Sequence, residues 1–333
     1  KVVVDTLTQQ AGTLINSSPA FYNEPMLEFA ALLNDNTVFS KAFFASSGAE
    51  ANESAIKLAR KHGQKFKQGA AEVITLARAF HGRTLATMSA TGKPQWKDLF
   101  EPKPLGFKQA KFNDIESIKS TITPNTCAIM LEPIQGEGGV YPADHRFISE
   151  LKTICDQENI LLIFDEVQTG FGRTGKLFGY EHFDVVPDIM TLGKGIGSGF
   201  PMSAMLTHDK LDLFEPGDQG GTYTGQPLAM AVGNAVLTEI IDKNLSENSE
   251  KMGKLLREGL EERKNSLGIA EIRGVGLLIG IDFQHDNAAE FAQKCFDNKL
   301  ILAMAGPKTV RLVPPLIISE EHIQDFFRII DSL

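Results

Sequence analysis

The sequence predicts an α/β fold, with a large domain built on a mostly parallel sheet and a smaller α/β domain at the carboxyl end. Short apolar runs alternate with helical periodicity through the first two thirds of the chain, which is typical of parallel sheets. Two of these runs end on an acid, at Glu132 and Asp165, where the strands of open sheets hold ligands. A long helical stretch from about 228 to 265 then separates a second set of strands and helices from the first.

Apolar residues at helical spacing predict helices at 2–15, 25–33, 115–120 and 145–157, and a further helix that follows the run from Ser46 to Asn52 and extends to Arg60. Apolar runs bounded by polar residues predict strands at 42–45, 73–76, 127–131, 160–164, 189–192 and 202–207. The stretch 94–113 is rich in Pro, Lys and Phe without periodicity, so we expect a loop.

The long helical stretch has an expected break near Asn244. Beyond it, the same patterns predict strands at 269–273, 277–283 and 310–313 and helices at 287–298 and 320–331. We therefore expect a remnant of an amino-terminal segment at 1–16, a large domain at 17–236 and a small domain at 237–333.

The composition excludes several classes of protein. The 333 residues are 42% hydrophobic and 23% charged, as in ordinary globular proteins, and suffice for two domains. A formal net charge of -9 leaves no basic surface for nucleic acid or for an anionic membrane, and no apolar run is long enough to cross one. The three cysteines lack metal-ligand spacing, so we expect no metal site and a reducing, cytoplasmic location.

The stretch from Asp165 to Lys194 is the most informative. Asp165 ends one predicted strand, and Lys194 follows the next strand between two glycines that would let the backbone turn. A carboxylate and a lysine amine at strand ends suit pyridoxal phosphate, which bonds to a lysine and needs a carboxylate at its ring nitrogen. Taken singly, the lysine could be a solvated loop residue and the acid a helix cap or metal ligand.

Ser47, Gly48 and Ala49 precede a predicted helix, and its free N–H groups could hold a phosphate. The alternative is an ordinary N-cap, with Glu50 and Glu53 satisfying the first turn.

Other candidates also follow strands. Phe80 could stack on a flat ring and Arg83 could hold a carboxylate, although each could equally be a core or surface residue. His81, between them, is expected to be structural. A glycine-rich turn carries Glu137, and Arg311 lies in an apolar strand, where it is paired, snorkelling or a ligand clamp.

Together the motifs resemble those of the class III aminotransferases, the ornithine and acetylornithine type of pyridoxal-phosphate enzymes with fold type I. The resemblance covers essentially the whole chain and rests on SSGAEANESAIKLAR, AFHGRT, LEPIQGEGGV, IFDEVQTGFGRTGKLFGYEHF, PDIMTLGKG, GTYTGQPLA and VRLVPPL, in that order. EGGVYPAD and GRTGKLFGYEHF are most similar to the acetylornithine subgroup.

The resemblance implies that Lys194 bonds to the cofactor and transfers a proton, while Asp165 pairs with the pyridinium nitrogen. Gln168 would hydrogen-bond the ring hydroxyl, and Phe80 would stack on the ring. The phosphate would be held by Gly48 and Ala49 with Ser47 near them, and by Thr222 of the other subunit, so the site would need a homodimer.

For the substrate, the resemblance implies that Arg311 binds the α-carboxylate of glutamate and Arg83 a second carboxylate. Glu137 would pair with Arg311 when the acetylornithine side is bound, with Glu132 supporting the region. The expected reaction moves the δ-amino group of N-acetylornithine to 2-oxoglutarate, a step of arginine biosynthesis.

Ornithine, succinylornithine or 4-aminobutyrate are alternative donors, and a non-catalytic phosphate-ligand-binding relative is an alternative of another class. Family members carry a further segment before the point where this sequence begins, so contacts from it are not assigned. In addition, Gly197-Ser198-Gly199-Phe200 replaces a run usually richer in glycine, and Gln226 stands where asparagine is more usual.

Overall fold

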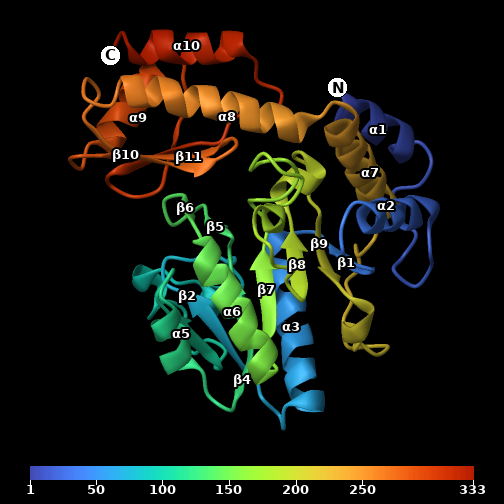
Figure 1. The fold of residues 1–333 in the computed structure, drawn as a ribbon. Coiled ribbons are helices and arrows are strands. Elements are labelled where there is room, and N and C mark those ends of the chain that lie inside the picture. Colours follow the sequence, from blue (N-terminus) through green and yellow to red (C-terminus); the bar gives the residue numbers. More distant parts are fainter.

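The computed structural model describes residues 1–333 and contains a central sheet of seven strands (Figure 1). Its spatial order is β1-β9-β8-β7-β4-β2-β3. β9 pairs antiparallel with both β1 and β8, while all other neighbours are parallel. The predicted mostly parallel sheet is therefore confirmed. The strands are β1 (Lys41–Ala45), β2 (Glu72–Leu76), β3 (Phe107–Ala110), β4 (Thr126–Leu131), β7 (Leu161–Asp165), β8 (Ile189–Leu192) and β9 (Ser203–Thr207).

The middle strands are buried on both faces, which explains their unbroken apolar sequences. In β4, Ile129 and Leu131 join one hydrophobic core, while Ala128 and Met130 join the core on the opposite face. Helices cover the two faces of the sheet (Figure 1), and α3 packs against β1, β4, β8 and β9. These helices are α3 (Gly48–Phe66), α4 (Leu85–Ala90), α5 (Ile115–Thr121) and α6 (His145–Glu158).

Two amino-terminal helices pack beside a helix from far along the chain (Figure 1). α1 (Val2–Ala11) and α2 (Glu24–Asp35) both contact α7 (Pro227–Asp242). α1 ends earlier than the predicted 2–15 helix because its chain leaves helical geometry after Gly12.

A second sheet of four antiparallel strands lies at the carboxyl end, in the order β10-β11-β13-β12. The long helical stretch breaks at Asn244, whose φ of 51° is left-handed, and α8 then crosses over the sheet (Figure 1). The predicted boundary between 236 and 237 lies inside α7; the domain limits stay a prediction. The elements are α8 (Leu245–Glu262), β10 (Ile269–Val275), β11 (Leu278–Phe283), α9 (Ala288–Asp297), β12 (Ala303–Met304), β13 (Thr309–Leu312) and α10 (Glu320–Ile330).

Some short elements differ from the prediction. The stretch 94–113, predicted as loop, contains strand β3, which pairs only with β2 and lies at the sheet edge. Its sequence Phe107-Lys108-Gln109-Ala110 is only partly buried, so it lacks the apolar run of a central strand. The glycine-rich turn after β4 is framed by a hairpin, β5 (Ile134–Gln135) and β6 (Tyr141–Pro142). None of the helices combines the length and apolarity needed to span a bilayer.

Candidate functional site

Three adjacent parallel strands bring the predicted site residues to one edge of the sheet. β4, β7 and β8 are neighbours, and Glu132, Asp165 and Lys194 lie at or just beyond their carboxyl ends. Because parallel strands present their carboxyl ends on the same side, the three side chains converge there.

The turn after β8 is made by Lys194 itself rather than by its glycine neighbours. Lys194 has a φ of 45°, whereas Gly193 is extended at -167°. Gly193 is needed for close approach instead, since a Cβ there would lie 3.0 Å from Val167 Cγ1. A left-handed lysine is uncommon and costs conformational energy, a feature that clusters at functional sites.

The Asp165 carboxylate is buried and held by three donors. Asn52 Nδ2 donates to Oδ2 at 2.8 Å, His81 Nδ1 lies 2.8 Å from the same oxygen, and Val167 N donates to Oδ1 at 3.0 Å. Asn52 is oriented in turn by Thr191, whose hydroxyl donates to Asn52 Oδ1 at 2.6 Å. The structural role expected for His81 is therefore to hold Asp165, and its buried Nε2 has no partner.

The Lys194 side chain extends into a cavity and forms no hydrogen bond or ion pair. Its surface is open to the cavity, but protein walls surround the amine, and this burial lowers the pKa of the ammonium. The carboxylates of Glu132, Asp165 and Glu137 act in the opposite direction. A lysine with a lowered pKa is more readily available as the free amine near neutral pH.

Glu132 joins two segments of the site. Its Oε1 accepts a hydrogen bond from Phe80 N at 2.9 Å, and its Oε2 accepts one from Gly136 N at 3.2 Å. Burial raises the pKa of this carboxyl to about 7. It thus ties the chain after β2 to the turn after β4, as the predicted supporting role requires.

An ion pair closes the site from the second sheet. Arg311 Nη1, on β13, lies 2.8 Å from Glu137 Oε1 and donates to Gln168 Oε1 at 3.3 Å. Burial disfavours ionisation of Glu137, but Arg311, with smaller effects of Lys194 and Lys93, outweighs it and lowers the pKa. Arg311 Nε is buried without a partner.

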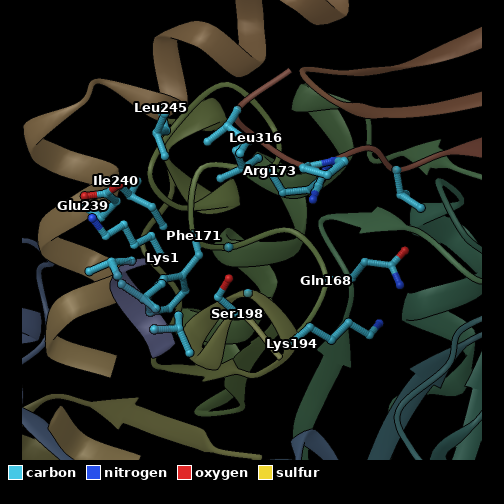
Figure 2. Close-up of a pocket in the computed structure, with 18 of the residues that line it drawn as sticks. Lys1, Gln168, Phe171, Arg173, Lys194, Ser198, Glu239, Ile240, Leu245 and Leu316 are labelled. Carbon is cyan, nitrogen blue, oxygen red and sulfur yellow. The ribbon is translucent and has the colours of Figure 1, made fainter. Parts of the chain in front are cut away.

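Lys194 and the Glu137–Arg311 ion pair line one cavity of about 610 Å³ (Figure 2). Its polar wall contains Lys194, Gln168, Glu137 and Arg311, and Figure 2 shows Lys194 and Gln168 extending in the same direction. The opposite wall is mostly apolar and comes from the starts of α1 and α8, from α7 and from the segment after β13. The volume suits a small molecule with a charged end.

The start of α3 combines an ordinary side-chain N-cap with free backbone N–H groups, the two alternatives considered from the sequence. Ser47 caps the helix, with its hydroxyl accepting from Glu50 N and donating to Glu50 Oε2 at 2.9 Å. Gly48 and Ala49 are the first helical residues, so their N–H groups have no acceptor within the helix. A Cβ on Gly48 would lie 2.8 Å from Val167 Cγ1, so glycine lets the helix start approach the chain after β7.

The other predicted site residues do not line the lysine cavity; they are Asp165, Ser47, Gly48, Ala49, Phe80, Arg83 and Thr222. Phe80 is half-buried, with its ring centroid 5.8 Å from that of Trp96. Arg83 is exposed and lies over the Trp96 ring, 4.5 Å from its centroid. Thr222 is also exposed and lines a separate cavity of about 330 Å³ with Ser46, next to the start of α3.

Two site residues were missed from the sequence. Asn52 carries a signal in retrospect, since it is a polar residue on the buried face of α3. Arg173 lines the cavity and donates from Nη1 to the carbonyls of Leu277 at 3.1 Å and Pro314 at 2.5 Å. It thereby ties the cavity loop to the second sheet. No group of three or more His, Cys, Asp and Glu is arranged to hold a metal.

The residues present fit pyridoxal phosphate. An unengaged amine at Lys194 faces the cavity, and a buried carboxylate at Asp165 is fixed in orientation by its donors. Free N–H groups at the start of α3 suit a phosphate. Lys194, Asp165, Gln168 and the α3 start would hold the cofactor.

Known proteins are similar to this chain over nearly its whole length. Residues 1–333 match the family described as aminotransferase class-III. The acetylornithine aminotransferase of Caldanaerobacter subterraneus subsp. tengcongensis is 44% identical over 99% of this chain and 85% of its own length.

Solved structures are similar as well. The ornithine aminotransferase of Toxoplasma gondii ME49 has a TM-score of 0.95 at 32% identity, covering 99% of this chain and 81% of that one. The acetylornithine aminotransferase of Elizabethkingia anophelis has a TM-score of 0.86 at 35% identity, covering 99% and 83%. The family resemblance predicted from the motifs is thus confirmed, and the chain belongs to the class III aminotransferases, which are pyridoxal-phosphate-dependent transaminases.

Proposed function

We propose that this protein moves the δ-amino group of N-acetylornithine to 2-oxoglutarate, giving N-acetylglutamate semialdehyde and glutamate. The observation that carries the proposal is the Glu137–Arg311 ion pair, 2.8 Å long, in the wall of the Lys194 cavity. The names of the similar curated relatives, at 41 to 46% identity, support the choice of donor.

The ion pair answers a problem that this reaction poses. Glutamate and 2-oxoglutarate present a carboxylate next to the reacting carbon, whereas N-acetylornithine reacts at its far end and has none there. Arg311 binds that carboxylate in one half-reaction, and Glu137 neutralises the arginine in the other. An unpaired buried guanidinium would be costly, so an internal acid lets one cavity accept both substrates.

The reacting centre is assembled by Lys194 and Asp165. When bound, pyridoxal phosphate supplies an electron-withdrawing ring that stabilises negative charge at the substrate carbon. The Lys194 amine, favoured in its free form by its lowered pKa, would remove a proton from the amine-bearing carbon of the donor in one half-reaction and deliver a proton to the matching carbon of the acceptor in the other. Asp165, fixed in orientation by Asn52 and His81, would pair with the ring nitrogen.

The remaining predicted roles are part of the proposal. Phe80 would stack on the ring, Gln168 would bond the ring hydroxyl, and Arg83 would leave Trp96 to bind the second carboxylate. Thr222 completes the phosphate site of a partner subunit. A homodimer is supported by exposed aromatic side chains, with Phe21 69%, Tyr22 83% and Tyr223 59% exposed.

We also propose a cytoplasmic location and a place in arginine biosynthesis. Cys127, Cys155 and Cys295 are all free thiols, which suits a reducing compartment.

The absorbance spectrum tests the proposal directly. Purified protein with pyridoxal phosphate should be yellow, and N-acetylornithine alone should shift the spectrum. Turnover at fixed 2-oxoglutarate should be fastest with N-acetylornithine, compared with ornithine, succinylornithine and 4-aminobutyrate. Faster turnover with any of these three would reassign the donor, and a colourless protein that binds only phosphate compounds would mean a non-catalytic relative.

A further inference from the structure

The Glu137 carboxylate lies between two cations. Its Oε1 contacts Arg311 Nη1 at 2.8 Å, and its Oε2 lies 3.9 Å from Lys93 Nζ. The three side chains are 29%, 10% and 20% exposed for Glu137, Arg311 and Lys93. Lys93 belongs to the chain after α4, whereas Arg311 belongs to β13 of the second sheet. One acid therefore has a short contact with one cation and a longer contact with another.

Lys93 has no other acid within ion-pair distance. Its amine instead lies over two aromatic rings, 5.2 Å from the centroid of Phe80 and 5.3 Å from that of Trp96. Such rings attract a cation and restrict where it can go. The ammonium is thus kept beside Glu137 without competition from another carboxylate.

The backbone of the turn that carries Glu137 is fixed against the second sheet. Gly139 O accepts a hydrogen bond from Arg273 Nε at 2.8 Å, and the Arg273 guanidinium also lies 4.0 Å from the centroid of the Tyr141 ring. Val140 is fully buried with a φ of 60°, which a β-branched residue adopts only when its surroundings impose it. Movement of the carboxylate is therefore a rotation of the Glu137 side chain.

We propose that Lys93 is a positioning residue that receives the Glu137 carboxylate when a substrate carboxylate occupies Arg311. The inference rests on the proposed exchange at Arg311 and extends it. A carboxylate arriving at Arg311 displaces Glu137, which is largely shielded from water. With Lys93 present, the displaced acid keeps a cation within ion-pair distance; without Lys93 it would have no such partner, which is unfavourable.

Lys93 consequently favours the half-reaction with glutamate or 2-oxoglutarate over the one with N-acetylornithine. In the latter, Glu137 stays on Arg311 and the longer contact to Lys93 contributes little. Loss of the Lys93 charge should therefore weaken the half-reaction with glutamate and leave the half-reaction with N-acetylornithine nearly unchanged.

The test measures each half-reaction separately by rapid mixing of the loaded enzyme. Lys93→Met should raise the substrate concentration for half-maximal rate about five- to tenfold with glutamate, the effect of losing a partly buried ion pair. The maximal rate with glutamate, and both parameters with N-acetylornithine, should stay within about twofold. Lys93→Arg should restore the glutamate value, and Lys97→Met, on an exposed lysine nearby, is the matched control.

A double-mutant comparison isolates the contact. In a Glu137→Gln background, Lys93→Met should no longer change the glutamate value, because no displaced charge needs a partner. Equal effects on both half-reactions, no effect on glutamate, or the same effect in both backgrounds would each overturn the inference. If Lys93→Met fails to fold, the same half-reaction measurements on Lys93→Gln, compared with those on Lys93→Arg, test the inference by the same criteria. Loss of the N-acetylornithine reaction in the parent would instead refute the proposed donor, while the glutamate arm still tests Lys93.

Discussion

Asn52 and Asp165 are joined by a buried hydrogen bond of 2.8 Å, although 113 positions separate them in the sequence. The same Asn52 amide also donates to the carbonyl of His81 at 2.7 Å, and its oxygen accepts from Thr191. The carboxylate is therefore oriented by α3, by the chain after β2 and, through Asn52, by β8. Its direction is set by the protein before any ligand binds, which is the preorganisation that electrostatic catalysis requires.

Asp165→Asn should lower kcat about 10²- to 10³-fold, because the negative charge at the ring nitrogen is lost while the packing is nearly unchanged. Steady-state turnover and the unfolding midpoint should be measured together. Asn52→Leu removes one hydrogen-bond donor but keeps the Asp165 carboxylate, so it is the control and should lower kcat less. An Asp165→Asn enzyme that retains parent turnover would show that this carboxylate does not support the reaction.

Lys194→Ala and Lys194→Gly should both abolish turnover and the visible absorbance of the covalently bound cofactor. They should differ in stability, since residue 194 has a φ of 45° and only glycine adopts it without strain. We expect the glycine variant to be more stable by up to about 1 kcal/mol in urea unfolding. Transamination by the alanine variant at the parent rate would refute the role of Lys194.

Glu166 should make the stability fall as pH rises from about 4.5 to 7. Burial raises the pKa of its carboxyl to about 7, although Gly179 N, Tyr180 N and Thr169 Oγ1 donate to it. The unfolded chain has the ordinary value of about 4.3, so the folded protein binds more protons in this window. The contribution of Glu166 to stability is full below the window and lost above it.

Glu166→Gln should remove this pH dependence. Between pH 4.5 and 8, its free energy of unfolding should rise relative to that of the parent by up to about 3 kcal/mol. The measurement is urea unfolding across that range. Glu262→Gln, on a side chain 78% exposed, is the control and should follow the parent curve. Parallel curves for Glu166→Gln and the parent would contradict the prediction.

Gly48→Ala should weaken cofactor retention about tenfold or more, because its Cβ would lie 2.8 Å from Val167 Cγ1 and push the α3 start away. Titration of the cofactor-free protein with pyridoxal phosphate measures this. Gly12→Ala is the control, because its Cβ would lie 3.4 Å from the nearest atom, the carbonyl oxygen of Gln9, which is an ordinary van der Waals contact. A second change, Val167→Ala, should restore part of the affinity; unchanged affinity in Gly48→Ala would mean that the helix start does not hold the phosphate.

The sequence predicted the strands well where burial on both faces leaves continuous apolar runs, as in β4 and β7. It failed at β3, an edge strand whose four residues include Lys108 and Gln109. Lys194 and Asp165 were identifiable because strand ends face ligands in such sheets. Arg173 and Lys93 were not, because their importance comes from contacts between distant segments, which no local pattern encodes.

Helix α3 carries both Gly48 at its first turn and Asn52 one turn later. The rigid helix therefore fixes the distance between the proposed phosphate position and the Asp165 carboxylate. Arg311 belongs to a separate sheet. The cavity can therefore be refitted to new amines through β13 and the Glu137 turn while the spacing of the cofactor anchors stays constant.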